Sequence, residues 1–547
     1  MDKNKIRLSD TTTTSTLPCP IHIKNLENYL QITNYDKIKT CQLILGFKFG
    51  FDLGHRGTTT NDLKVKNLTS ALKNPKEINK ALNKELQAGR LAGPFKEPPF
   101  TNFQISPIGL VPKKNGKFRL IVHLSSPKAD SINSHIDNIF SDVKYATLQD
   151  AFKLILGMGP HPYMAKLDIQ SAFRLIPIKP EQYNLLCIKW EDQYFHDRCL
   201  PMGARSSCAL FESFSSAIEH IAVKQGVTSV IHYLDDFFLV NRNKEGCQKD
   251  LSKITNICAA LQVPLAAEKT KGPTQILDFL GFEINTISET VSLPKEKVLR
   301  GIMLINKALE SRKISLEKFQ SILGFLNFAS TVIFPGRAFL QNLYAKTSSV
   351  SKPYHKVTLN KQDKEDLHMW KQFLSHHNGI YLYKEELFLS PQVLHLYTDA
   401  CGSLGMGAVL GTHWLYAQWP SQWYHDQNIV FLEFLPIIFA IKTWGTALKN
   451  KVVLLHLDNE ALVYVINKQS SKETLVRMLL RNMVMCLLNF NIVLKATHIP
   501  GINNILADSL SRLQITRFQR LHLQADATPA ELPPLPQEMS SCTKLCF

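Results

Sequence analysis

The feature that most constrains the fold is a pair of adjacent carboxylates, Asp235 and Asp236, set between two apolar runs. The runs, residues 227–231 and 237–240, are rich in β-branched and aromatic side chains, which is typical of strands. The sequence Tyr233-Leu234-Asp235-Asp236 therefore predicts a hairpin with two acids at its turn. Adjacent like charges beside apolar material oppose folding, and a bound Mg²⁺ would remove that penalty. A solvated surface turn is the simpler alternative.

The length and charge of the chain bound its class. Its 547 residues are enough for about three or four domains. The formal net charge of +17 predicts a polyanionic partner, most simply nucleic acid, although a solubilising surface would give the same charge. The 11 cysteines are scattered, as expected of reduced thiols in an intracellular protein. We expect no membrane segment and no signal peptide, and both nucleus and cytoplasm are compatible with the sequence.

Further acids end apolar runs elsewhere in the chain. Asp168 follows the predicted strand 163–167, where a lone Asp can cap a helix or serve as a metal ligand. A second α/β segment, beginning near Val393, carries Asp399, Glu433, Asp458 and Asp508. An embedded acid is costly unless it is paired, and few basic residues are near in sequence. Mg²⁺ would balance both sets, and two-metal phosphoryl chemistry requires such carboxylate clusters.

A basic turn, Lys113-Lys114-Asn115-Gly116-Lys117, joins predicted strands 108–111 and 118–124. It is either a solvated turn or, together with Arg119, a hairpin that contacts phosphate. Periodic apolar residues predict helical segments over 67–91, 206–224, 293–345 and 431–444. Residues 346–390 are polar and predict a connecting region. Residues after 514 become basic and then Pro-rich, which predicts a flexible tail.

In this order and spacing, the motifs resemble those of a reverse transcriptase joined to a ribonuclease H, over residues 67–513. The motifs are Ser106-Pro107, Val111-Pro112-Lys113-Lys114, Phe118-Arg119-Leu120-Ile121, Leu167-Asp168, Ala172-Phe173, Leu200-Pro201-Met202-Gly203, Tyr233-Leu234-Asp235-Asp236, Phe279-Leu280-Gly281-Phe282, Thr398-Asp399-Ala400 and Ala507-Asp508-Ser509-Leu510-Ser511-Arg512. Within that group the chain looks most like the DIRS-type, tyrosine-recombinase retrotransposons. The motifs for this narrower likeness are Ala88-Gly89-Arg90 to Pro99-Phe100, His123-Leu124-Ser125-Ser126-Pro127 and Met202-Gly203-Ala204-Arg205-Ser206-Ser207-Cys208-Ala209.

The resemblance implies a multidomain fold of the α+β and α/β classes. A polymerase right hand, with fingers, palm and thumb, would be followed by a connection and an RNase H-like domain. The implied boundaries are 1–66 for a partly disordered N-terminal extension, 67–290 for fingers and palm, 291–350 for a helical thumb, 351–390 for the connection, 391–514 for the RNase H-like domain and 515–547 for a flexible tail.

The resemblance also implies roles by position. Asp168 and Asp235 would bind both polymerase metals with help from Asp236, and the four acids of the second set would bind the ribonuclease H metals. Each site would hold two Mg²⁺, or Mn²⁺ in their place. The residues expected to contact the incoming nucleotide are Lys113, Lys114, Arg119, Phe173, Met202, Gly203 and Lys269.

Two of these residues leave alternatives open. Lys269 would act as general acid on pyrophosphate, although Lys271 is nearby. Phe173 would pack under the sugar and exclude a 2′-hydroxyl, or it is simply a core residue.

The sequence departs from related enzymes at several points. Met202 stands where retroviral enzymes carry a Gln that touches the sugar, so the sugar contact must differ. The loop between His498 and Asp508 is short and offers no clear counterpart of a catalytic-loop His, and His498 itself should end a strand. We find no Asp-Thr/Ser-Gly protease motif, no zinc knuckle and no integrase zinc cluster.

The implied activity is that of an RNA-directed DNA polymerase, a nucleotidyltransferase, with ribonuclease H endonuclease activity, from a mobile element. Its partners would be an RNA template, a DNA primer, an RNA–DNA hybrid, dNTPs and a separately encoded recombinase. One rival is a domesticated or decayed copy that binds nucleic acid without catalysis. The other is a particle scaffold that packages RNA by charge. The presence of all seven acids argues against decay, and packaging needs no buried carboxylates.

Overall fold

The chain divides into two units, Met1–Leu280 and Gly281–Phe547. A computed structural model describes residues 17–533 apart from 60, 114, 115, 129, 349, 351, 377, 382–387, 389 and 421–428. Residues 1–16, part of the N-terminal extension expected to be partly disordered, lie outside the described residues. The division falls before residue 290, the end predicted for the palm. None of the described helices is both long and apolar enough to cross a membrane.

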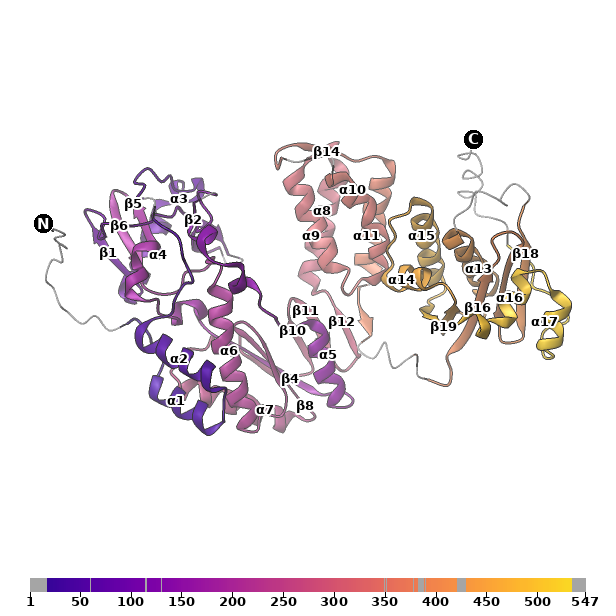
Figure 1. Cartoon of the computed structure of the whole chain (residues 1–547), viewed down its shortest axis with the longest axis horizontal. Coiled ribbons are helices and arrows are strands. Elements are labelled where there is room, and N and C mark those ends of the chain that lie inside the picture. The colour runs from indigo at the N-terminus through magenta and orange to yellow at the C-terminus, as the bar shows by residue number, and fades with distance from the viewer. Residues whose placement is uncertain are drawn as a thin grey trace, which may run out of the picture. The chain divides into compact units, whose positions relative to one another are not determined.

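Helices and small sheets alternate in the N-terminal unit (Figure 1). Its helices are α1 Ile23–Ile32, α2 Lys37–Phe49, α3 Thr69–Leu72, α4 Pro75–Gln87, α5 Leu148–Gly157, α6 Ser207–Lys224 and α7 Lys244–Ala260. Its strands are β1 Leu91–Phe95, β2 Ile108–Pro112, β3 Phe118–Val122, β4 Tyr163–Asp168, β5 Cys187–Trp190, β6 Gln193–Asp197, β7 Val230–Tyr233, β8 Asp236–Asn241, β9 Lys271–Thr274 and β10 Ile276–Phe279. Short 3₁₀ helices include η1 Ile132–His135 and η3 Ala172–Leu175.

An antiparallel sheet in the order β7-β8-β4-β9 carries the acidic hairpin. Helix α6 contacts β7, while α7 contacts β4 and β8, and Figure 1 shows both helices against this sheet. Apolar residues of the strands, such as Leu167 and Phe237, are fully buried in one core cluster. The apolar runs therefore form strands because both a neighbouring strand and a covering helix bury them.

The N-terminal helices belong to the same core. Leu26 and Leu30 of α1 and Phe47 of α2 lie in the cluster that contains Leu167 and Phe237. The rings of Phe47 and Phe214 of α6 meet edge to face with centroids 5.0 Å apart. Within the N-terminal extension predicted for residues 1–66, α1 and α2 are therefore part of the packing behind the sheet.

The fingers segment consists of two smaller pairings. Strands β1, β6 and β5 form one antiparallel sheet, and β2 pairs with β3 as a hairpin. The expected single helix over 67–91 is instead two helices, α3 and α4. The break falls at Asn74-Pro75 because Pro disfavours helical geometry in the residue before it, and Pro75 then starts α4.

The C-terminal unit begins with a small sheet and a helical segment. The elements are β11 Phe282–Asn285, β12 Thr290–Ser292, α8 Lys295–Glu310, β13 Lys313–Ser315, α9 Leu316–Ala329, η5 Phe334–Phe339, α10 Gln341–Ser348, β14 Lys356–Thr358, α11 Lys361–His376 and β15 Ile380–Tyr381. Helices α8, α9 and α10 confirm the helical character predicted for 293–345. The region predicted as a polar connection, residues 346–390, contains helix α11, in which Trp370 and Phe373 are buried and Phe373 packs on Phe339.

The rest of the C-terminal unit is a five-stranded sheet with helices. Its elements are β16 Leu394–Ala400, β17 Gly405–Leu410, β18 His413–Gln418, α13 Ile429–Trp444, β19 Val452–Leu457, α14 Glu460–Lys468, α15 Thr474–Asn489, β20 Val493–His498, η7 Gly501–Asn503, α16 Ile505–Ser511 and α17 Ile515–Leu521. The order is β18-β17-β16-β19-β20, with β19 parallel to both neighbours. Parallel pairing places the ends of β16 and β19 at the same edge of the sheet.

A flexible tail directly after residue 514 is wrong for its first part. Helix α17 follows there, and Phe518 is fully buried against Trp414 of β18, with ring centroids 4.9 Å apart. Residues 534–547 lie outside the described residues. The basic composition that suggested a tail belongs to the exposed side of α17, whereas a single aromatic residue anchors the helix.

Candidate active sites

The acidic hairpin forms as the sequence predicts, with a two-residue turn. Tyr233 of β7 pairs with Asp236 of β8, and Asp236 also pairs with Asp168 of β4 across the sheet. Leu234 and Asp235 form the turn, and Leu234 adopts a φ of +54°, which is unfavourable for a bulky L-residue. Sheet pairing thus brings together three carboxylates from positions far apart in sequence.

Lys269 supplies the cation next to these acids. Its Nζ lies 2.8 Å from Oδ1 and 2.7 Å from Oδ2 of Asp168, a buried residue. The open choice between Lys269 and Lys271 is thereby narrowed, because Lys271 is exposed in β9 and pairs with Lys166 of β4. Burial lowers the pKa of Lys269, but the hydrogen bond and charge of Asp168 outweigh it and the pKa is raised. Lys269 therefore keeps its proton at neutral pH.

The pKa values of both acids in the hairpin are raised. Burial raises the pKa of Asp235 above its usual range, and the charge of Asp168 raises it further. Burial likewise raises the pKa of Asp236, although the charge of Lys166 opposes this. Each carboxylate would gain stability from another cation.

Some of the residues expected to contact the incoming nucleotide lie close to one another. Nη1 of Arg119 lies 3.6 Å from the sulfur of Met202, so β3 and the loop before α6 meet. Burial and the nearby charge of Arg119 lower the pKa of Lys113. Lys114 lies outside the described residues. Gly203 adopts a φ of +105°, which a residue with a side chain rarely adopts.

Phe173 lies on η3, five residues after Asp168. It is partly buried, and its ring meets that of Phe211 of α6 edge to face at 5.5 Å. This position is compatible both with a wall beneath a sugar and with a core residue, so the role of Phe173 stays a prediction.

Asn133 of η1 is a residue that the sequence did not indicate. Its Nδ2 donates to Oγ of Ser125 at 2.8 Å and to the carbonyl of Gly203 at 2.9 Å. Its Oδ1 accepts from the backbone N–H of Arg205 at 2.8 Å. Asn133 thus holds the Met202-Gly203 loop, and no local signal reveals a contact across 70 residues.

The second set of acids gathers at one edge of the five-stranded sheet. Asp399 lies near the end of β16 and Asp458 directly follows β19. Glu433 comes from α13 and Asp508 from α16, and α13 and α16 both contact β16. His498 ends β20, as expected.

Mutual repulsion within this set shifts its pKa values. Burial raises the pKa of Asp399 to about 6, and Asp458 and Asp508 add to the shift while Ser511 opposes it. Burial raises the pKa of Glu433 to about 7, opposed by a hydrogen bond with Asn459. Clustered acids with raised pKa values are typical of functional sites.

Basic and hydroxyl groups hold several of these oxygens. Nε of Arg512 lies 2.6 Å from Oδ1 of Asp508, and the hydroxyl of Ser511 donates to Asp399. Asn459, Ser511 and Arg512 were not predicted as site residues, although Ser511 and Arg512 belong to a motif quoted from the sequence.

The donor sets can be compared with what a metal requires. Within the described residues, no three His, Cys, Asp or Glu side chains are placed to hold a metal ion. Lys269 on Asp168 and Arg512 on Asp508 occupy oxygens that a cation would use. Carboxylate oxygens are nevertheless the donors that Mg²⁺ prefers, and the chain itself places positive charge on them. The donor chemistry therefore fits a divalent cation, with these basic partners released.

Comparison with known proteins bears on the first site. Residues 111–284 match the family described as "Reverse transcriptase (RNA-dependent DNA polymerase)". These residues are a reverse transcriptase domain. The reverse transcriptase domain contains Asp168, both acids of the hairpin, and Lys269.

Two curated relatives indicate where such a domain occurs. The chain is 25% identical over 249 residues to the Pro-Pol polyprotein of feline foamy virus, which is 46% of this chain and 20% of that protein. It is 23% identical over 454 residues to the transposon Tf2-3 polyprotein of Schizosaccharomyces pombe, which is 79% of this chain and 30% of that protein. The reverse transcriptase domain is of the kind found in retroelement or retroviral-type polyproteins, and the chain spans less than a third of either relative.

A solved structure supports the fold. The foamy viral protease-reverse transcriptase dRH in complex with ds DNA aligns with a TM-score of 0.51 at 16% identity, covering 87% of this chain and 82% of that one. The expected fold class, a mixed α/β polymerase architecture, is confirmed.

Proposed function

We propose that the chain is an RNA-directed DNA polymerase. One observation carries this: within a reverse transcriptase domain, sheet pairing places Asp168 beside Asp236 at a turn that also holds Asp235, with Lys269 on Asp168. A nucleic acid partner agrees with the net charge of +17. Foamy viral relatives of this fold are found in complex with dsDNA and with RNA/DNA hybrid.

In this proposal each residue has a distinct task. Asp168 and Asp235, assisted by Asp236, would hold two Mg²⁺, which lower the barrier by stabilising charge on the attacking and leaving oxygens. Arg119 and Lys113 or Lys114 would bind the triphosphate. The primer 3′-hydroxyl would lose its proton to solvent as its oxygen bonds to the α-phosphorus and the bond to the pyrophosphate oxygen breaks. Lys269, released from Asp168 when the metal ions bind, would donate its proton to that oxygen.

We further propose that the second set of acids cleaves the RNA strand of a hybrid. One edge of the sheet carries Asp399, Glu433, Asp458 and Asp508. The pKa values of Asp399 and Glu433 are raised, so a bound cation would stabilise their charged forms. The basic groups on these acids, such as Arg512, would turn outward to meet phosphates.

The DIRS-type assignment is also a proposal. It rests on the three sequence motifs given above and implies a separately encoded recombinase. Sequencing the DNA that flanks the gene would test it, because a neighbouring reading frame for a tyrosine recombinase is expected and a gene for a zinc-cluster integrase would overturn it.

Primer extension on an RNA template with Mg²⁺ tests the main proposal. The wild-type chain should incorporate deoxynucleotides, and Asp235→Asn should abolish incorporation. Asp192→Asn is the matched control, because its side chain is 98% exposed, and it should change nothing. A folded wild-type chain that binds the template but does not extend the primer would instead be a domesticated or decayed copy.

A further inference from the structure

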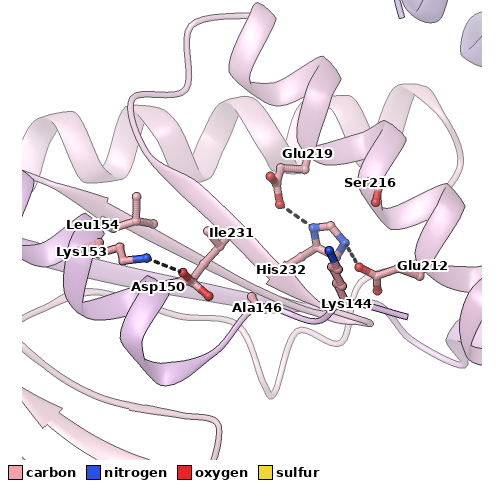
Figure 2. A pocket seen from close by; sticks show the side chains of 10 residues that line it. All are labelled: Lys144, Ala146, Asp150, Lys153, Leu154, Glu212, Ser216, Glu219, Ile231 and His232. Carbon is pink, nitrogen blue, oxygen red and sulfur yellow. Dashed lines mark hydrogen bonds and ion pairs between the residues drawn. The ribbon is translucent and has the colours of Figure 1, made fainter. Parts of the chain in front are cut away.

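His232 lies on β7, separated from the turn of the acidic hairpin by Tyr233, and its ring bonds two side chains of helix α6. Nδ1 lies 2.5 Å from Oε2 of Glu219, and Nε2 lies 3.0 Å from Oε1 of Glu212. Figure 2 shows the two carboxylates approaching opposite edges of the ring. The side chain of His232 is 7% exposed, so both ties form largely out of water.

The ring also contacts the other strand of the hairpin. His232 pairs with Phe237 across the hairpin, and their rings stack with centroids 5.3 Å apart. Phe237 directly follows Asp236. One side chain therefore touches both strands at the base of the turn and also holds the helix behind them.

The bonds of His232 hold a strand that has few other constraints. Strand β7 is the edge strand of its sheet, so backbone pairing fixes it on one side. The next residues form the turn in which Leu234 has a φ of +54°. An unfavourable backbone conformation persists only when contacts with the surrounding structure stabilise it. At an edge strand, backbone pairing on one side is not enough, so side-chain contacts must contribute.

The two glutamates favour the protonated, bridged state of His232. The cavity that they line, of about 440 Å³, also contains Lys144 and the pair Asp150–Lys153 (Figure 2). Burial lowers the pKa of His232, but the hydrogen bonds with Glu212 and Glu219 outweigh it and raise the pKa to about 9. The imidazolium therefore donates to both carboxylates at neutral pH.

We propose that His232 is a positioning residue, whose ties to Glu212 and Glu219 fix the hairpin so that Asp235 and Asp236 face Asp168. The role rests on the proposed polymerase function. The same α6 starts just after the loop that carries Met202, so the tie links the acidic hairpin to the helix behind the expected nucleotide loop.

The test compares full-length variants at a temperature well below their unfolding. His232→Phe keeps an aromatic ring on Phe237 but removes both ties. The double variant Glu212→Gln, His232→Gln replaces the charged bond between these two side chains by a neutral hydrogen bond. His220→Gln is the matched control, because this histidine lies on α6 itself and bonds the carbonyl of Thr33 instead.

Two readouts separate positioning from folding. One is kcat and KM for primer extension; the other is Mn²⁺ affinity, measured by paramagnetic resonance in an Asp458→Asn background that weakens the second acidic set. His232→Phe should lower kcat about tenfold, with KM for the primer–template unchanged, and weaken Mn²⁺ binding about tenfold. The double variant should recover most of both, and the control should stay within about twofold.

The following results would overturn the proposed role of His232. A folded His232→Phe with wild-type kcat and Mn²⁺ affinity overturns the proposal, even if its melting temperature falls. If His232→Phe does not fold, Glu219→Ala removes the more exposed tie, and unchanged kcat and Mn²⁺ affinity there overturn it equally. A wild-type chain without primer extension defeats the proposed function, while Mn²⁺ affinity still reports on positioning.

Discussion

At the scale of single residues, both acidic sites are built from side chains that lie far apart in the sequence. The position of Asp168 at the end of a strand and of Asp235 in a turn could be predicted, because apolar runs mark strands locally. The contact of Lys269, and not of Lys271, with Asp168 could not be predicted, because it depends on how the segment after β8 returns to β4. Asn133 and Ser511 were missed for the same reason: a polar residue on a helix carries no local sign of a partner that lies far away in the sequence.

Lys269 and Lys271 form a natural pair for mutation. Lys269→Met removes the proposed proton donor and should lower kcat for incorporation by about 10²-fold, the lower end of what general acids contribute. Lys271→Met changes an exposed residue of β9 and should change kcat by less than about threefold. Single-turnover primer extension measures both, and equal losses in the two variants would remove Lys269 from its assigned role.

Phe173 tests sugar selection. Phe173→Val keeps the position apolar but removes most of the ring, so ribonucleotide use relative to deoxyribonucleotide use should rise by about 10²-fold. Comparison of kcat/KM for the two nucleotides on one template measures this ratio.

The control for this prediction is the neighbouring ring. Phe211→Val removes a fully buried aromatic that contacts Phe173, so it should lower stability without changing the ratio. An unchanged ratio in Phe173→Val, with lowered stability, would make Phe173 a core residue.

At the scale of elements, local periodicity predicted the strands that carry acids, but not the helices that long-range packing selects. Helix α17 exists because Phe518 meets Trp414 more than 100 positions earlier, although its composition resembles that of a tail. Helix α11 was hidden in polar sequence, and its buried face depends on partners such as Phe339.

The acidic edge of the five-stranded sheet should be less stable at high pH. The folded pKa of Asp399, about 6, exceeds its ordinary value of 3.8, so its contribution is fully favourable below pH 4 and is lost as pH rises through 6. Asp399→Asn should therefore stabilise the C-terminal unit at pH 8 by up to about 3 kcal/mol, and by less at pH 5. Thermal unfolding at both pH values measures this difference.

Asp526 provides the opposite case in the same unit. A hydrogen bond from His413 lowers the pKa of Asp526, so Asp526→Asn should not stabilise the protein at either pH. Added Mg²⁺ should raise the melting temperature of the C-terminal unit in the wild type but not in Asp399→Asn. Equal stabilisation by both substitutions would contradict the account of the acidic edge.

At the scale of the whole molecule, the two acidic sets lie in different units and should fail independently. Asp235→Asn should abolish DNA synthesis and leave RNA cleavage in a hybrid nearly intact, because Asp235 lies in the N-terminal unit. Asp458→Asn should do the reverse. Both activities are measured on one labelled hybrid, and loss of both in either folded variant would refute two separate sites.

Binding of a duplex should depend steeply on salt. A chain of net charge +17 releases counterions from the phosphates that it contacts, so log affinity should fall by about 0.9 per contact for each unit of log salt. A hybrid of A-like form should be held by its backbone and shape, not by its sequence. Titrations at several salt concentrations on two unrelated hybrids measure this, and a flat response or a strong preference for one sequence would count against it.

The positive φ of Leu234 has a consequence for how this position can drift between generations. Glycine would relieve about 1–2 kcal/mol of backbone cost there, but would also lose a side chain that packs against the core, a loss of similar size. Selection for a folded protein is therefore nearly indifferent between leucine and glycine at position 234. Under the proposed function, retention of leucine at this position across related copies would therefore reflect selection on DNA synthesis and not on folding.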